Sequence, residues 1–234
     1  MSGKDFDSLA PMTSPASSGP DGILTSRAAS PVGSLPSLAE DPPRSARWHL
    51  REATDASHRS LDAALSRFDL SDAGDYRRFL AIHAMVLPPL EGALARADFE
   101  RSCRGWRDSG RGRALRKDLV GLGIEPVVLR IVPRVSVAGA WGVAYVLEGS
   151  RLGGKILARR VAAGGEPLAI GNARFLSCAS ILPWPRFVER LEEALASRCD
   201  LGAAIEGARM AFAMFEDALE RVGDGASWNL GERS

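Results

Sequence analysis

The sequence predicts an all-α fold built on one domain of about 180 residues. From residue 46 onward, apolar residues recur at three- and four-residue steps, the spacing of one face of an α-helix. Ala, Leu and Arg dominate the central region and aromatics make up 6% of the chain, a bias that favours helix over sheet. The segments between the periodic stretches are mostly short, as in packed helical domains, and seven or eight helices are expected.

The two ends of the chain differ from this central domain. Residues 1–45 hold seven of the fourteen prolines, many serines and a single aromatic, Phe6. Such a segment buries too little apolar surface to offset its ordering entropy, so we predict a disordered tail, with a docking arm as the alternative. We therefore expect the helical domain at 46–223 and a frayed tail at 224–234.

Composition narrows the class of protein. The formal net charge of +1 argues against a nucleic-acid-binding protein. No apolar run reaches the ~18 residues that span a bilayer, and the N-terminus lacks the apolar core of a secretory signal, so no membrane partner is expected. Cys103, Cys178 and Cys199 show no CxxC spacing, which indicates reduced thiols in a cytoplasmic protein.

The first half of the domain reads as two helices and a loop. A helix is expected over 46–68, with Ser45 as its N-cap, and a turn over 70–75. A second helix starts at Tyr76, is interrupted by Pro88-Pro89 and resumes over 90–99. The arginine-rich stretch 104–113 is interpreted as an exposed loop, with anion binding as the alternative.

The second half contains more breaks. A short helix is expected over 115–122, and the β-branched stretch 126–133 is extended or forms a short helix. The longest predicted helix covers 136–163 and contains Gly149, Gly153 and Gly154. The remaining predictions are a weaker segment at 168–182, a helix from Pro183 to Ala196 and a last helix over 201–222.

The three glycines inside the helix at 136–163 need a reason. A glycine within a helix costs roughly 1 kcal/mol relative to alanine. The usual reasons are that another group approaches the backbone closely or that the helix bends there. We expect this stretch to form one wall of a pocket for a flat ligand.

The three histidines are the main candidates for chemistry. His58 and His83 fall on or beside apolar helical stripes and His49 lies near a stripe edge, so on periodicity alone a buried core histidine is favoured over a ligand for each of them. Arg51 precedes His58 by two helical turns, about 10 Å along the axis, a spacing that suits a ligand with a metal and a peripheral carboxylate. A plain surface arginine is the alternative. The patterns of di-iron bundles, phosphate loops and serine hydrolases are absent from the sequence.

Two stretches together resemble the heme oxygenase family, especially its bacterial form. LREATDASHRSLD (Leu50–Asp62) is similar to the family's proximal-helix pattern, and YVLEGSRLGGKIL (Tyr145–Leu157) is similar to its distal-helix pattern. The resemblance extends over about Arg47–Val222. It implies an all-helical, single-domain, heme-oxygenase-like fold in which heme lies between a proximal and a distal helix.

The resemblance also implies residue roles. His58 is the axial iron ligand and Arg51 holds a heme propionate. Gly149 and Gly153 let the distal backbone approach the porphyrin, with Ser150 between them at the catalytic face. The implied remaining contacts to the heme come from Tyr145, Arg159 and Phe212.

The chemistry implied by the resemblance is cleavage of heme by O₂ to biliverdin, CO and ferrous iron. Heme is then both cofactor and substrate, and electrons come from a reductase or a ferredoxin-type donor. The alternatives are a heme sensor or carrier of the same fold and a helical relative that lacks heme.

The sequence departs from the family pattern at two positions. Ser150 stands where mammalian-type members carry a distal aspartate, a replacement shared with the bacterial form. Glu192 stands where some members carry a basic, propionate-binding residue, and Arg186 or Arg190 is the expected substitute.

Overall fold

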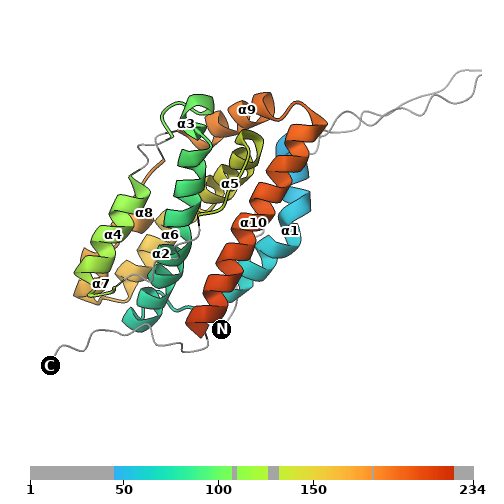
Figure 1. Cartoon of the computed structure of the whole chain (residues 1–234). Coiled ribbons are helices and arrows are strands. Elements are labelled where there is room, and N and C mark those ends of the chain that lie inside the picture. Colours follow the sequence, from blue (N-terminus) through green and yellow to red (C-terminus); the bar gives the residue numbers. More distant parts are fainter. Residues whose placement is uncertain (1–44, 107–109, 126–131, 181, 224–234) are drawn as a thin grey trace, which may run out of the picture. The chain divides into compact units, whose positions relative to one another are not determined.

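The computed structural model describes residues 45–106, 110–125, 132–180 and 182–223, and all regular secondary structure within these ranges is helical. The all-α prediction is therefore confirmed (Figure 1). The helices are α1 (Ala46–Leu65), α2 (Ala73–Arg96), α3 (Phe99–Ser102), α4 (Arg111–Gly121), α5 (Val137–Gly149), α6 (Gly154–Ala163), α7 (Pro167–Gly171), α8 (Arg174–Ser177), α9 (Trp184–Ala194) and α10 (Arg198–Gly223).

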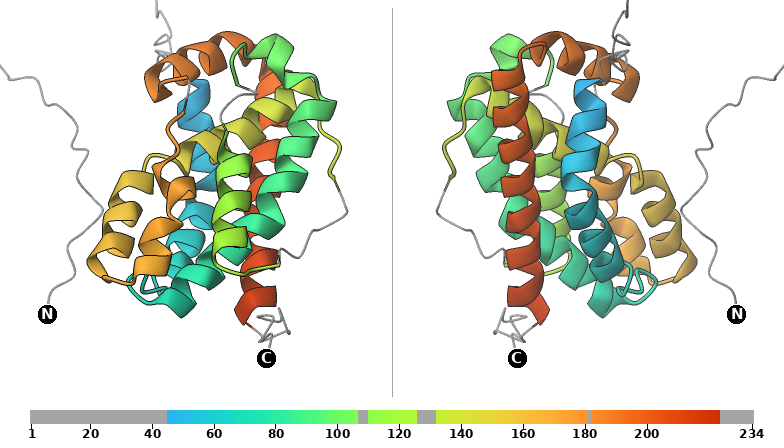
Figure 2. Two further views of the ribbon diagram at one scale, coloured as in Figure 1. Left: turned by 90° about the vertical axis from the view of Figure 1, so that its left-hand side faces the viewer. Right: turned by 90° about the vertical axis from the view of Figure 1, so that its right-hand side faces the viewer.

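The long helix α10 supports the helices that carry the candidate functional site, α1 and α5. It packs most extensively on α5, then on α1 and α2, and it runs beside α1 in both views of Figure 2. The α5–α10 contact depends on glycine. A Cβ on Gly142 would collide with the Ala204 carbonyl, and one on Gly207 with the Gly139 carbonyl. Backbone therefore lies against backbone at this crossing.

Helix α1 is fixed at its start from two directions. The Ser45 hydroxyl accepts a hydrogen bond from the Trp48 N–H at 3.2 Å, which confirms the expected N-cap. The Glu192 carboxylate on α9 accepts from the N–H groups of Ala46 (2.7 Å) and Arg47 (3.0 Å). A carboxylate is favourable at a helix N-terminus, so Glu192 ties α1 to α9.

The helices α4, α6, α7 and α8 form a second group to one side of α2 (Figure 1). The fully buried Asp118 on α4 accepts from the Phe175 N–H at 2.7 Å and pairs with Arg174 at 3.1 Å. The Tyr76 hydroxyl on α2 donates to the Asn172 carbonyl at 2.8 Å. These bonds hold the short helix α8 in place, although the sequence predicted only a weak segment there.

Several predicted boundaries are wrong. Helix α2 runs unbroken through Pro88 and Pro89, because buried Leu87 and Leu90 on either side hold the helix while each proline removes one main-chain hydrogen bond. The first helix ends at Leu65, not at residue 68. Most of the predicted extended stretch 126–133 lies outside the described residues.

The predicted helix 136–163 is two helices separated by a kink. Leu152 N–H bonds to the Gly149 carbonyl (3.1 Å) and Gly154 N–H to the Arg151 carbonyl (3.0 Å), both three residues back. This is the tighter 3₁₀ pattern, which turns the chain between α5 and α6. Gly154 has a packing reason, since a Cβ there would meet the Leu176 carbonyl of α8.

In the part of the chain that the structure describes, no helix combines the length and the apolar character needed to cross a bilayer.

The close crossing of α5 and α10 yields a stability prediction. Gly142→Ala should lower the free energy of unfolding by about 1–3 kcal/mol, because the added methyl forces the two backbones apart. Gly202→Ala, on the exposed side of α10 with open space around it, is the control and should be neutral or stabilising by up to about 1 kcal/mol. Chemical denaturation of both variants measures this, and equal effects would contradict the crossing.

Candidate functional site

The buried stripe of α1 has a gap at His58. Ala46, Leu50, Thr54 and Leu61 are buried at helical spacing, and His58 lies four residues after Thr54 and three before Leu61. Its side chain is nevertheless 62% exposed. An inward-facing position that stays open to solvent indicates that a further molecule belongs there.

The structure separates His58 from the other histidines. His83 is buried among Phe79, Phe175 and Phe215, with ring centroids at 4.3–5.5 Å, and its Nδ1 bonds to the Phe79 carbonyl at 2.8 Å. Burial lowers the pKa of His83 to about 3, so its imidazole stays neutral. His83 is therefore a core histidine, and His58 is the one placed for chemistry.

His58 is oriented by Asp62, one helical turn away. The Nδ1 of His58 lies 3.0 Å from the Asp62 carboxylate. This hydrogen bond raises the pKa of the imidazole above its ordinary value. Nδ1 is thus engaged and Nε2 is the nitrogen that can bind a metal, with a carboxylate behind the ring as in many metal-binding histidines.

The second candidate wall is the backbone around the kink between α5 and α6, which is linked to α1 through the Trp184 ring. A Cβ at Gly153 would have no heavy atom within 4 Å, and one at Gly149 would meet only the rim of the Trp184 indole at 3.9 Å. Neither glycine has a positive φ, so the backbone conformation does not require glycine at either position. What the two glycines provide is free space over this stretch of backbone.

Cations and aromatic rings gather at one edge of this space. The Arg47 guanidinium lies over the Trp184 ring at 5.9 Å, and Tyr145 packs against the same ring at 5.8 Å. Burial raises the pKa of the Tyr145 hydroxyl, while the charges of Arg47 and Arg51 act to lower it. Two cations from α1 and one phenol from α5 therefore share this edge.

A buried arginine fastens the kink from behind. Arg111, 5% exposed, donates to the Leu147 carbonyl (2.8 Å) and to the Ser150 hydroxyl (2.7 Å), and its guanidinium lies over Phe175 at 4.6 Å. Burial and the nearby positive charge of Arg151 lower the pKa of Arg111 to about 9, so it stays charged at neutral pH. The Ser150 hydroxyl in turn donates to the Leu147 carbonyl at 2.8 Å.

Two carboxylates balance this charge, half-buried Glu91 and buried Glu148. Glu91 receives the Gly112 N–H, and burial raises the pKa of its carboxyl. Glu148 is 4% exposed, lies 3.3 Å from the Arg151 Nε and accepts from the Trp106 Nε1–H at 3.2 Å. The kink is therefore backed by a buried polar network instead of an apolar core.

Most of the predicted site residues come together, and three do not. The Phe212 ring of α10 lies 6.0 Å from that of His58. Arg159 is exposed on α6, and none of the contacts among the described residues connects it to His58 or Tyr145. Arg186 pairs with Glu189 at 2.7 Å and Arg190 donates to the Arg104 carbonyl at 2.9 Å, so neither takes the expected place of a propionate ligand.

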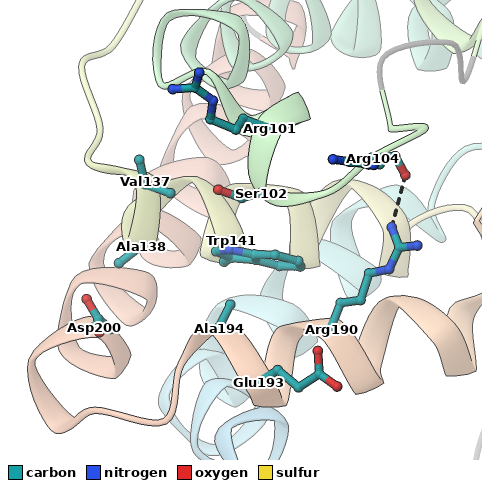
Figure 3. Close-up of a pocket in the computed structure, with 10 residues that line it drawn as sticks. All are labelled: Arg101, Ser102, Arg104, Val137, Ala138, Trp141, Arg190, Glu193, Ala194 and Asp200. Carbon is teal, nitrogen blue, oxygen red and sulfur yellow. Dashed lines mark hydrogen bonds between the residues drawn. The ribbon is translucent and has the colours of Figure 1, made fainter.

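Arg190 instead lines a separate cavity of about 560 Å³ beside Trp141 (Figure 3). Its lining includes Arg101, Arg104 and Glu193, and His58 and Gly149 are not part of it. The α5 residues that line this cavity, Val137, Ala138 and Trp141, lie in the N-terminal half of the helix, away from the kink that follows its C-terminal end.

Three further residues contribute to the site without having been predicted to do so: Arg111, Trp184 and Glu192. Arg111 was placed in an exposed loop, yet it lies four residues before buried Leu115 and eight before buried Leu119, a spacing that marks the inner face of α4. Trp184 had no distinguishing pattern around it. Glu192 binds the α1 N-terminus, a long-range contact without a sequence signal.

This chain is similar to known proteins in both sequence and structure. No family model matches the chain. A heme oxygenase of Xanthomonas campestris pv. campestris (strain 8004) is 36% identical over 150 residues, which cover 63% of this chain and 90% of that protein. The crystal structure of the NO- and CO-bound heme oxygenase of Neisseria meningitidis matches with a TM-score of 0.65 at 25% identity, over 81% of this chain and 95% of that one.

The His58–Asp62 pair predicts a pH titration. In the protein without added ligand, the imidazole of His58 should titrate above pH 6.5, and Asp62→Asn should lower that midpoint. The pair stabilises the fold while His58 is protonated, so its contribution is present below about pH 6.5 and is lost as the pH rises through the raised pKa. NMR of the imidazole protons measures this. A midpoint unchanged by Asp62→Asn would show that the pair does not form in solution.

Proposed function

The chain belongs to the heme oxygenase family, and we propose that it degrades heme at the site between α1 and the α5–α6 kink. The observation that carries this proposal is the pairing of an exposed, inward-placed His58 with the open glycine positions Gly149 and Gly153. The proposed products are biliverdin, CO and ferrous iron, formed with O₂ and electrons from a separate reductase or ferredoxin-type donor. We place the reaction in the cytoplasm.

The residues present fit a heme. Gly153 offers open space where a side chain would otherwise stand, which suits a flat ring lying on the backbone. Two exposed apolar side chains lie close to these glycines in the sequence. Leu152, three residues after Gly149, is 60% exposed, and Ile156, three residues after Gly153, is 43% exposed. A large apolar ligand would cover such surface.

His58 supplies the metal ligand in this proposal. Its Nε2 binds the heme iron as a neutral donor, and Asp62 holds the Nδ1 proton and thus the tautomer. Phe212 packs edge-on against the ring and limits its rotation. When bound, heme supplies the iron that binds and activates O₂ and the porphyrin ring that is cleaved.

The arginines and Tyr145 hold the polar edge of the ligand. Arg51 and Arg47 project from the first turns of α1, and Tyr145 faces the same edge from α5. Guanidinium groups bind carboxylates in a fixed fork geometry, so these residues suit the propionates. This contact would set the rotation of the ring and hence the carbon that is attacked.

The kink residues serve the oxygen side. Glycine at 149 and 153 keeps the backbone close to the ring and leaves no Cβ to obstruct the reacting oxygen. The Ser150 hydroxyl donates its hydrogen bond to the Leu147 carbonyl, and Arg111 donates to both the Ser150 hydroxyl and the Leu147 carbonyl. We assign to the network of Arg111 and Glu91 the task of holding the water that delivers protons, since both groups are charged or titratable and lie behind the kink.

The ligand assignment is tested by His58→Ala. This variant should lose the Soret spectrum of an imidazole-ligated heme and bind hemin at least tenfold more weakly, about 1.4 kcal/mol. Its thermal stability should change little because the side chain is exposed. His49→Ala on the same helix is the control. If His83→Ala loses the spectrum instead, α1 is not the proximal helix.

The oxygen-side wall is tested by Gly153→Leu. The new side chain enters open space, so the fold should survive, but it occupies the place of the ring and hemin affinity should fall at least tenfold, about 1.4 kcal/mol. Gly202→Leu, at another open glycine on α10, is the matched control and should bind hemin normally.

A turnover experiment separates heme degradation from simple heme binding. Hemin-loaded protein is given ascorbate or a ferredoxin-type reductant in air. Loss of the Soret band with growth of a biliverdin absorption supports degradation, while a stable ferrous complex would assign the protein to heme sensing or transport.

A further inference from the structure

Six aromatic side chains form a continuous row through the domain, which we call the aromatic row. Its members in order are Tyr145, Trp184, Phe187, Trp141, Phe99 and Trp106. Successive ring centroids lie 5.8, 5.6, 5.7, 4.9 and 5.5 Å apart. Three of the chain's five tryptophans belong to it, although aromatics are sparse in this sequence.

The two ends of the aromatic row reach different places. Tyr145 and Trp184 stand at the proposed heme site, beside Arg47 and the Gly149 backbone. Trp106, half-buried at the other end, lines a second cavity of about 220 Å³ whose charged lining has both signs: Arg111, Arg113 and Arg116 together with Glu91, Asp98 and Glu100. The middle is buried, with Phe187 and Phe99 fully enclosed and Trp141 2% exposed.

A proton acceptor, the Glu148 carboxylate, lies beside the Trp106 indole. The indole Nε1–H donates at 3.2 Å to the carboxylate of buried Glu148. An indole that has lost one electron becomes a strong acid at this N–H, so a carboxylate in this position can take the proton as the electron leaves. The hydrogen bond would then lower the cost of oxidising Trp106.

Packing alone does not account for this arrangement. Edge-to-face and offset ring contacts at these distances are favourable in any core. Yet tryptophan and phenylalanine alternate from Trp184 to Trp106. Indole and phenol are the side-chain rings that lose an electron most readily, whereas phenylalanine does not, so the two phenylalanines act as spacers. The oxidisable rings therefore begin at the site and end at a cavity with a charged lining.

We propose that the aromatic row conducts single electrons from a small one-electron reductant at the Trp106 cavity to the heme site, where they remove peroxide that escapes productive turnover. This rests on the proposed function, because the site must hold heme. The mixed charges of the cavity lining do not select the donor by its charge, and ascorbate is the probe used below. The row would thereby protect Tyr145 and the kink from oxidation.

The reaction balances. One electron passes from Trp106 through Trp141 and Trp184 to the site as the indole proton moves to Glu148. A one-electron donor such as ascorbate then reduces Trp106, and Glu148 returns the proton. Two such transfers, with two protons, reduce one hydrogen peroxide to two water molecules.

The test uses the full chain loaded with hemin, with the Soret band recorded first. One equivalent of hydrogen peroxide is added without reductant. Samples frozen within a second are examined by electron paramagnetic resonance, and oxidised residues are located by peptide mass spectrometry. The variants are Trp141→Phe, which keeps an aromatic ring in the core, and Trp106→Phe at the half-buried end. Trp48→Phe, on α1 where Trp48 packs on His49, is the matched control.

The native chain should give a tryptophanyl radical and oxidation concentrated at Trp106. Trp141→Phe should lower Trp106 oxidation at least tenfold and move the damage to Tyr145 and Trp184, with hemin binding unchanged. Trp106→Phe should accumulate damage at Trp141 and Trp184. Equal Trp106 oxidation in the native chain and Trp141→Phe, or equal oxidation of Trp48 and Trp106, overturns the row while leaving heme degradation standing. Failure to bind hemin overturns both.

Discussion

The contact of bare backbone between α5 and α10 determines where the candidate site can be. Gly142 and Gly207 allow the two helices to touch without side chains between them, and α10 also supports α1. The helices that form the two walls of the site, α1 and α5, therefore both pack on α10. His58 from α1 and the kink after α5 keep a fixed relation because neither wall depends on the other for support.

Buried charge holds the functional backbone in this protein. The kink has tight turns and open glycines, features that by themselves give a mobile segment. Arg111 of α4 bonds to the Leu147 carbonyl, and Trp106 bonds to the Glu148 carboxylate directly before Gly149. A buried guanidinium is costly to place, and its bonds to the Leu147 carbonyl and Ser150 hydroxyl compensate only in this geometry. The network thus trades stability for a defined backbone position next to the ligand.

The sequence was sufficient for the elements whose signal is local. Helical periodicity and the Ser45 cap located α1, and glycine spacing pointed to the kink region. The sequence was insufficient where distant segments decide. Pro88 and Pro89 looked like a break because local chemistry favours one, whereas burial of Leu87 and Leu90 in the folded domain keeps α2 intact. Arg111 looked solvated because its partners lie 36 and 39 residues further along the chain. Between His58 and His83, only burial in the folded domain could decide.

The negative φ values at Gly149 and Gly153 have a consequence for how such proteins diverge. The backbone conformation at these two positions does not require glycine, so of the two demands described above only the proposed heme contact would. Gly142, Gly154 and Gly207 are constrained by packing whatever the protein binds. A descendant that stops using heme should therefore lose the first pair early and retain the other three. Among relatives of this chain, retention of the three packing glycines would indicate a shared fold, whereas retention of Gly149 and Gly153 would indicate that the relative still uses heme.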